Sequence, residues 1–144
     1  MNVDSAGRRR AREAALQMLY QWEVGRASAH EAIVTYWPSH DRDGEVGDPL
    51  REFANGLVRG TIARVTEIDA ILAAHAQHWR VERMAVIDRL VLRLAVYELL
   101  AEPGTPAKVV INEALELART YSGEEAVAFV NGVLDAARKE MKRD

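Results

Sequence analysis

The sequence predicts an all-helical protein, and three observations favour that class. Hydrophobic residues make up 49% of the 144 residues, whereas the 9 glycines and 4 prolines cluster between periodic runs. No segment alternates apolar and polar residues in the manner of a half-buried strand. Residues 86–100 carry apolar side chains on every side of a helical wheel, which is typical of a buried helix. We therefore expect a compact bundle of about six or seven helices wrapped around this central helix.

The charges of the central helix are few and scattered. Its four charged residues are Asp88, Arg89, Arg93 and Glu98, and they leave no wide face for solvent. The stretch is also too short and too charged to span a bilayer. Other helices must therefore cover it, and we expect a single domain over residues 1–144.

The N-terminal part of the chain shows clear helix boundaries. Residues 1–7 are small, polar and unpatterned, so we expect a mobile tail before a first helix from about Arg8 to Val24. Apolar residues recur at three- and four-residue spacing along its inner face, at Ala11, Ala15, Met18, Leu19 and Trp22. A second helix should have Ser28 as its N-cap and end before Pro38.

The principal loop should be residues 38–49, which contain every type of helix breaker and no periodicity. Asp48 and Pro49 at its end suit the N-cap and first turn of a helix. The apolar face of this third helix runs on to Leu72. We therefore expect one long helix between the loop and the middle of the chain.

Two turns divide the C-terminal part of the chain. Thr105 can cap, and Pro106 can open, the helix that follows the central one. Ser122 and Glu125 stand three residues apart before an apolar run, which matches a capping box. The expected buried stripes are Val110, Ala114, Leu117 and Tyr121 in one helix, and Val127, Val130, Leu134, Ala137 and Met141 in the last helix.

Composition limits the function classes. The absence of cysteine excludes disulfides, thiolate metal sites and cysteine nucleophiles. The start carries no apolar signal region, so we expect a soluble cytoplasmic protein that does not enter membranes. Residues 1–12 hold four arginines against one aspartate, a charge of +3, and the other 15 basic and 21 acidic residues give −6. An acidic body with a short basic end occurs in proteins that touch nucleic acid locally, and also in proteins that do not.

The first helix carries a candidate RNA surface. On a helical wheel Arg9, Arg12 and Tyr20 fall together on the outer flank. Guanidinium groups there could meet phosphate, and the tyrosine ring could stack on a base. The alternative is a solvated first turn beside a tyrosine at the edge of the core.

A weak metal pattern follows the third helix. The spacing of His75, His78 and Glu82 would put two imidazoles and a carboxylate on one face if a helix continued through Trp79 and Arg80. No fourth ligand accompanies them. We therefore favour a polar helix end, and we expect neither a metal nor another cofactor.

Four segments in order carry a recognisable set of motifs. They are residues 8–20 (RRRAREAALQMLY), 88–99 (DRLVLRLAVYEL), 110–118 (VINEALELA) and 129–135 (FVNGVLD). Together they resemble the family of the transcription antitermination factor NusB, and the resemblance covers most of the chain except the loop around residues 38–49. It implies an all-helical fold of two packed helical subdomains and an RNA-binding role without catalysis.

The resemblance also implies partners. Such proteins bind the boxA element of nascent ribosomal RNA leaders together with NusE, a small-subunit ribosomal protein. The assembly belongs to a complex in which RNA polymerase resists termination. Carried over position by position, the RNA-binding set is Arg8, Arg9, Arg10, Arg12, Tyr20, Glu125 and Phe129, and an acidic position on the NusE side matches Asp88.

Several other positions bear on how far the resemblance extends. Asn112, Asn131 and Gly132 also match the family pattern, and we favour structural roles for them. Ala126 and Ala128 stand where the family usually has polar residues. This departure weakens polar contacts from the last helix, so the arginines and aromatic residues carry most of the expected RNA surface.

Two other function classes compete with an RNA-binding factor. A NusB-like domain is also found in front of RNA cytosine methyltransferases, but that chemistry needs a cysteine nucleophile and a cofactor fold, and the chain has neither. A helical module that binds only protein is the other alternative, with its arginine run merely solvated. The oligomeric state stays open, because apolar helix edges suit a homodimer as well as another protein.

Overall fold

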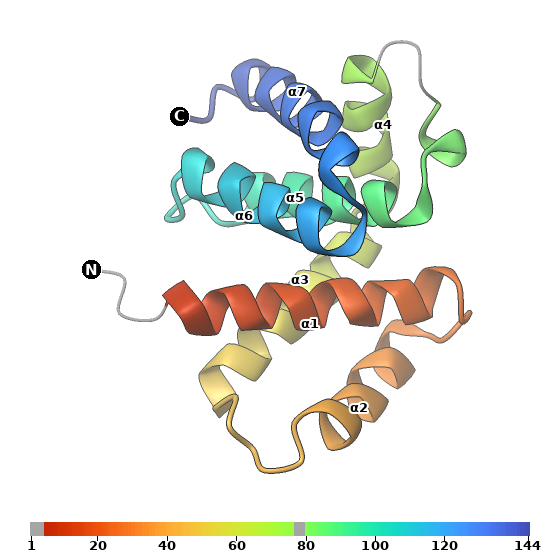
Figure 1. Cartoon of the computed structure of the whole chain (residues 1–144), viewed down its shortest axis with the longest axis vertical. Coiled ribbons are helices and arrows are strands. Elements are labelled where there is room, and N and C mark those ends of the chain that lie inside the picture. The colour runs from red at the N-terminus through yellow and green to blue at the C-terminus, as the bar shows by residue number, and fades with distance from the viewer. Residues whose placement is uncertain (1–4, 77–79) are drawn as a thin grey trace. The chain divides into compact units, whose positions relative to one another are not determined.

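The computed structural model describes residues 5–76 and 80–144, and all regular structure in these ranges is helical (Figure 1). Seven α-helices and one 3-10 helix form there, which confirms the all-helical class and the expected number of helices. The chain forms two compact units, Met1–Ile62 (unit 1) and Ala63–Asp144 (unit 2). Across the described ranges no helix is long and apolar enough to cross a membrane.

Unit 1 contains three helices, of which α1 packs along α2. They are α1 (Ser5–Glu23), α2 (Ala29–His40) and α3 (Asp48–Ala63). Four residues of the predicted inner stripe of α1 are buried, Ala11, Ala15, Met18 and Leu19, together with Ala14 and Leu16, whereas Trp22 is half-buried. Because α1 already begins at Ser5, the last part of the expected tail is helical, and residues 1–4 lie outside the described ranges.

The start of α2 is stabilised by the cap that the sequence predicts. The Ser28 hydroxyl accepts a hydrogen bond from the Glu31 amide at 3.0 Å. In return, the Glu31 carboxylate accepts one from the Ser28 amide at 2.9 Å. This reciprocal pair satisfies two backbone donors that the first helical turn leaves without a partner.

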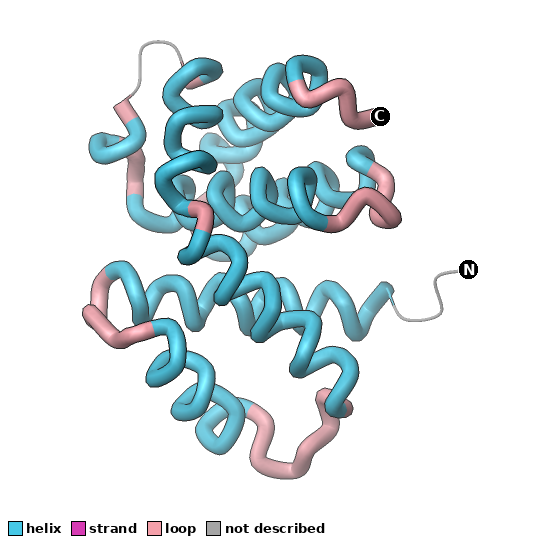
Figure 2. Tube along the Cα trace, turned by 180° about the vertical axis from the view of Figure 1, so that it is seen from behind, coloured by secondary structure: helices cyan, strands magenta, loops and turns pink. Residues whose placement is uncertain are grey.

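The prediction that α2 ends before Pro38 is wrong, because the helix runs on to His40. Proline removes only its own N–H donor, and the carbonyl left without that donor belongs to Val34. Val34 is 49% exposed, so Pro38 interrupts the hydrogen bonding on the solvent side of α2. The loop between α2 and α3 is therefore residues 41–47 rather than the expected 38–49 (Figure 2).

The long third helix that the sequence predicts is in fact two helices. α3 ends at Ala63, and α4 (Val65–His75) belongs to unit 2. Arg64 between them leaves helical geometry, with φ −110° and ψ 20°, and its guanidinium pairs with Glu67 at 2.9 Å. The apolar period continues across this break, so periodicity alone does not reveal it.

Unit 2 is built around the central helix, as the sequence predicts. Its elements are α4 (Val65–His75), η1 (Val81–Arg83), α5 (Val86–Ala101), α6 (Ala107–Tyr121) and α7 (Glu124–Glu140). α5 packs against α4, α6 and α7, and the charged Arg89, Arg93 and Glu98 are buried along with its apolar residues. Arg93 donates to both carboxylate oxygens of Asp69 at 2.8 Å. Such pairing allows a charged side chain to stay inside a helical core.

The predicted capping box at the start of α7 is wrong. Gly123 is the N-cap, with φ 138° and ψ 169°, and no side chain caps the helix. Essentially only glycine adopts that backbone region. The Glu125 carboxylate instead folds back, so that its Oε1 lies 2.8 Å from the place where a Cβ on Gly123 would stand. Tyr121, expected in the core, ends α6 with 37% of its surface exposed.

Candidate nucleic-acid interface

Helical winding distributes the four arginines of α1 over different faces. Successive residues turn by about 100°, so Arg8 and Arg12 share a face while Arg9 and Arg10 point elsewhere. The guanidinium carbon of Arg8 lies 4.2 Å from the centre of the Phe53 ring, and that of Arg12 lies 5.6 Å from it. Both distances suit a cation–π contact. Phe53 on α3 therefore holds two of the four arginines within unit 1.

The expectation that Arg12 lies on the outer flank of α1 is wrong, because Arg12 is only 4% exposed. On the helix Arg12 lies about 60° from Arg9, whereas Tyr20 lies only about 20° from it. That offset turns Arg12 toward Phe53, while Arg9 is exposed and Tyr20 is 39% exposed. The exposed flank of α1 therefore consists of Arg9 and Tyr20 without Arg12.

Arg10 is also held by an aromatic residue. Its Nη1 donates to the Tyr36 hydroxyl at 2.9 Å, and its Nη2 donates to the His40 carbonyl at 3.4 Å. The Tyr36 hydroxyl in turn donates to Oε1 of Gln17 at 2.7 Å. A guanidinium carries five N–H donors, so Arg10 retains donors for a ligand. Contacts with neighbouring residues thus fix the arginine side chains at the start of α1 in place.

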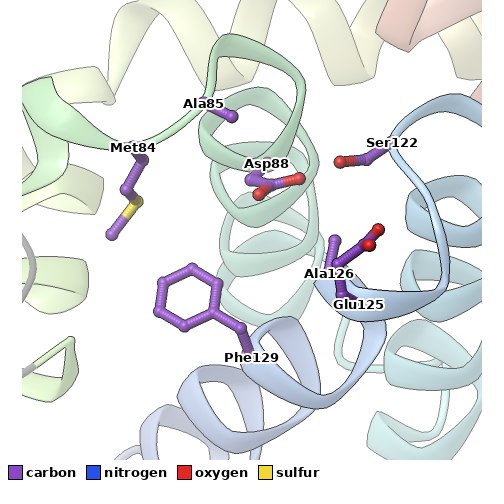
Figure 3. Close-up of a pocket in the computed structure, with 7 residues that line it drawn as sticks. All are labelled: Met84, Ala85, Asp88, Ser122, Glu125, Ala126 and Phe129. Atoms are coloured by element: carbon purple, nitrogen blue, oxygen red, sulfur yellow. The ribbon is translucent and has the colours of Figure 1, made fainter.

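The remaining candidate residues meet at one pocket in unit 2. The pocket has a volume of about 400 Å³ and is lined by Met84, Ala85, Asp88, Ser122, Glu125, Ala126 and Phe129 (Figure 3). The structure thus brings Asp88 together with Glu125 and Phe129, which lie far from it in the sequence. Ala126, where the family usually has a polar residue, contributes to the apolar lining.

Three elements position the side chains of this pocket. Asp88 is in the first turn of α5, and Glu125 and Phe129 stand one turn apart on α7. Met84 precedes α5, and its carbonyl accepts a hydrogen bond from Nη1 of the buried Arg89 at 3.2 Å. This bond ties the segment before α5 to the helix, so Met84 forms a fixed wall of the pocket.

Two carboxylates and one aromatic ring determine the chemistry of the pocket. Oδ1 of Asp88 is buried, and it has no hydrogen-bond partner among the residues that the structure describes. Glu125 is exposed, and Phe129 is half-buried on the side of the pocket near Met84 (Figure 3). An unpaired buried acceptor costs free energy until a donor reaches it. The pocket therefore favours a ligand that brings N–H groups, and its negative charge disfavours phosphate.

Sequence reasoning missed three of the pocket residues, Met84, Ala85 and Ser122. Ser122 was assigned to a helix cap, although in Figure 3 its hydroxyl points into the pocket toward Asp88. Met84 follows a 3-10 turn and has no sequence signal of its own. These residues are recognised as pocket residues only when the C-terminal end of α6 and the start of α5 are seen side by side (Figure 3).

The helix that the weak metal pattern requires is not formed, because α4 ends at His75. His78 lies outside the described residues. Nε2 of His75 contacts a carboxylate oxygen of Glu140 on α7, which joins two helices of unit 2. The polar helix end that we favoured therefore has a packing role at His75.

The fold and these two surfaces define a class of protein, namely an all-helical binding protein with a basic helix that carries an exposed aromatic residue and with an acidic, partly apolar pocket. The model of the NusB family matches residues 9–139. The transcription antitermination protein NusB of Solibacter usitatus (strain Ellin6076) is 51% identical over 137 residues, covering 94% of this chain and 91% of that protein. The chain belongs to the NusB family.

Another relative and two solved structures are also similar to this chain over most of its length. The transcription antitermination protein NusB of Koribacter versatilis (strain Ellin345) is 43% identical over 141 residues, covering 98% of this chain and 94% of that protein. The solved structure of T. maritima NusB matches with a TM-score of 0.82 at 36% identity, covering 92% and 91% of the two chains. A structure of antitermination factors NusB and NusE in complex with dsRNA matches with a TM-score of 0.83 at 28% identity, covering 94% and 98%.

Proposed function

We propose that this chain is a transcription antitermination factor that binds boxA-type single-stranded RNA of nascent ribosomal RNA leaders together with NusE. In this role it acts in the cytoplasm and supports processive transcription by RNA polymerase. The observation that carries the proposal is the exposed flank of Arg9 and Tyr20 on α1, in a chain of the NusB family. The similar complex of NusB, NusE and dsRNA supports both partners.

The two surfaces contribute to binding in different ways. Arg8, Arg9 and Arg10 supply positive charge for phosphates, and Tyr20 offers a ring for a base. In unit 2, Phe129 offers a second ring beside carboxylates that accept N–H groups. RNA affinity thus comes mainly from α1, and the pocket adds stacking at an electrostatic cost.

Salt dependence tests the cationic part of the proposal. For single-stranded RNA, each neutralised phosphate contributes about −0.7 to the slope of log affinity against log salt. Four arginines would give about −2.8, and the burial of Arg12 reduces the expected slope to about −2.1. The measurement is a salt series with a boxA-type strand, on the parent and on a variant with Ala at Arg8, Arg9 and Arg10. A variant that keeps both affinity and slope would remove α1 from the RNA site.

Thermodynamic linkage tests the role of NusE. If RNA and NusE bind as one complex, each must tighten the other by the same factor. Titration calorimetry around the full cycle measures that factor, and a value of one means independent sites. Asp88→Lys should weaken NusE binding while RNA alone binds nearly as before. A loss of both together with altered circular dichroism would indicate a damaged fold.

A helical module that binds only protein is the second candidate, and the pocket gives it specific support. An unpaired acceptor at Asp88 beside Glu125 suits a cationic or N–H-rich group of a protein. That candidate predicts NusE binding with no measurable RNA binding, with or without NusE. RNA binding with a salt slope that falls when the α1 arginines are replaced would decide against it.

A further inference from the structure

The start of α1 and the 41–47 loop form a second pocket, which the four motif segments leave without a role. It lies wholly in unit 1 and has a volume of about 590 Å³. Arg10, His40 and Glu45 are among its lining residues. His40 and Glu45 come from the part of the sequence that the family motifs do not cover.

The imidazole ring of His40 is held in a fixed orientation at this pocket. Its ring stacks on Tyr36 with a centroid distance of 4.1 Å and an interplanar angle of 2°. Its Nδ1 lies 3.0 Å from the Tyr36 carbonyl, and because a carbonyl only accepts, Nδ1 carries the proton. One face of the imidazole is thus occupied by Tyr36. Because His40 is exposed and lines the pocket, a ligand in the pocket can reach the imidazole on the side away from Tyr36.

The ring beneath His40 is itself held rigidly. Tyr36 is 4% exposed, its hydroxyl bonds to Arg10 and Gln17, and the ring of Trp37 meets it edge-on at 4.9 Å. An aromatic ring that is already ordered loses little conformational freedom when a flat ligand stacks on it. A flat ligand in the pocket would therefore extend the Tyr36–His40 stack by one ring.

The polar groups around the His40 ring differ in how much of their hydrogen-bonding capacity is already used. Asp41 accepts from the amides of Glu45 and Val46 at 2.9 and 3.0 Å and from Arg51 at 2.8 Å, so its oxygens already hold the loop. The Glu45 carboxylate has no hydrogen bond to any residue within the described ranges. Arg10 retains unused N–H donors beside it. The pocket thus presents one ring face, one cation and one available carboxylate.

We propose that this pocket binds one nucleotide of single-stranded RNA, with the base stacked on the open face of His40 and the phosphate at Arg10. Glu45 accepts from the base, which favours bases with an exocyclic amino group over uracil. The inference rests on the proposed RNA-binding function and extends its site along unit 1. The negative charge of Glu45 keeps the phosphate on the Arg10 side of the pocket.

Replacement of His40 on the full-length protein tests this site. His40→Ala should weaken binding of a boxA-type strand extended by three nucleotides at each end by about fivefold or more, the low end for loss of one base stack. His40→Trp keeps a ring face and should restore or exceed parent affinity. His30→Ala is the matched control, because His30 is exposed on the same helix and does not line the pocket. Thermal unfolding confirms that all variants fold.

A stacking signature separates contact from general weakening. RNAs that carry 2-aminopurine at successive positions should show one position whose fluorescence is quenched by the parent and by His40→Trp, but not by His40→Ala. If His40→Ala binds RNA like His30→Ala while the parent binds normally, the pocket is not an RNA subsite and the proposed function stands. If the parent binds no RNA, both proposals fail. Weakened NusE binding with unchanged RNA binding would assign the pocket to protein and overturn the inference.

Discussion

The basic start of α1 and the pocket of unit 2 carry opposite charges, although the family resemblance assigns residues of both to RNA, with Asp88 of the pocket on the NusE side. At α1, aromatic rings hold the arginines: Phe53 faces Arg8 and Arg12, and Tyr36 holds Arg10. In the pocket, the carboxylates of Asp88 and Glu125 lie on one side and the Phe129 ring on the other, near Met84 (Figure 3). If both surfaces bind RNA as we propose, attraction to the RNA backbone comes from unit 1, whereas the pocket of unit 2 favours groups that donate N–H to carboxylates.

The first prediction concerns the backbone that shapes the pocket. Gly123→Ala should destabilise the protein by about 1–3 kcal/mol, because φ 138° with ψ 169° is a region that alanine does not tolerate. A Cβ there would also stand 2.8 Å from Oε1 of Glu125. Urea unfolding measures the change. Gly132→Ala is the control, since a Cβ at that helical position meets nothing within 4 Å, and equal losses at both glycines would contradict the expectation.

The second prediction compares the two aromatic contacts. Tyr20→Ala and Phe129→Ala should each weaken RNA binding by about 1–3 kcal/mol if a base stacks on each ring. Tyr121→Ala is the control, because Tyr121 has a similar exposed fraction, 37% against 39% for Tyr20, and does not line the pocket. Fluorescence anisotropy with a boxA-type strand measures affinity. A loss at only one of the two rings would restrict RNA to that surface.

The third prediction separates two arginines that the helical wheel grouped together. Arg12→Ala should cost about 1–2 kcal/mol of stability through the lost contact with Phe53, and it should leave the salt slope of RNA binding unchanged. Arg9→Ala should reduce the magnitude of that slope by about 0.7 with little effect on stability. Urea unfolding and a salt series, run on both variants, measure the two quantities. The reverse pattern would show that Arg12 turns outward in solution.

The fourth prediction tests the electrostatic cost of the pocket. Glu125→Gln should tighten RNA binding by about 1 kcal/mol or less, the interaction expected for one charge pair about 4 Å apart in water. The glutamine keeps the shape of the side chain, and no cap is lost, because Gly123 rather than a box with Ser122 begins α7. Unchanged or weaker RNA binding by a normally folded variant would remove the start of α7 from the RNA face.

The fifth prediction is a pH dependence of the 41–47 loop in unit 1. The hydrogen bond from Arg51 chiefly lowers the pKa of Asp41 below 3.8, helped by the amides of Val46 and Glu45. A carboxyl whose pKa falls on folding stabilises the fold above the unfolded pKa, and this stability is lost as the pH falls through the folded value. The 41–47 loop should therefore loosen below about pH 4. Backbone NMR of Val46 during an acid titration measures this, and Asp41→Asn should show loosening already at neutral pH.

Local patterns in the sequence determined much of the fold. The apolar wheel of residues 86–100 predicted the buried α5, and Ser28 as N-cap predicted the start of α2. These predictions succeed because they depend on neighbours within one or two helical turns. The break at Arg64 and the continuation past Pro38 were missed, because apolar periodicity and helix breakers constrain helix ends only weakly.

The candidate sites depended on information that no local pattern contains. By itself the sequence determined the family motifs, the charged start of α1 and the residues to test. Only the tertiary structure placed Phe53 against Arg12 and stacked His40 on Tyr36. It also brought Asp88 and Phe129 into one pocket. The physical reason is that a helical wheel fixes the direction of a side chain, whereas its burial and partners depend on which other helix stands in that direction.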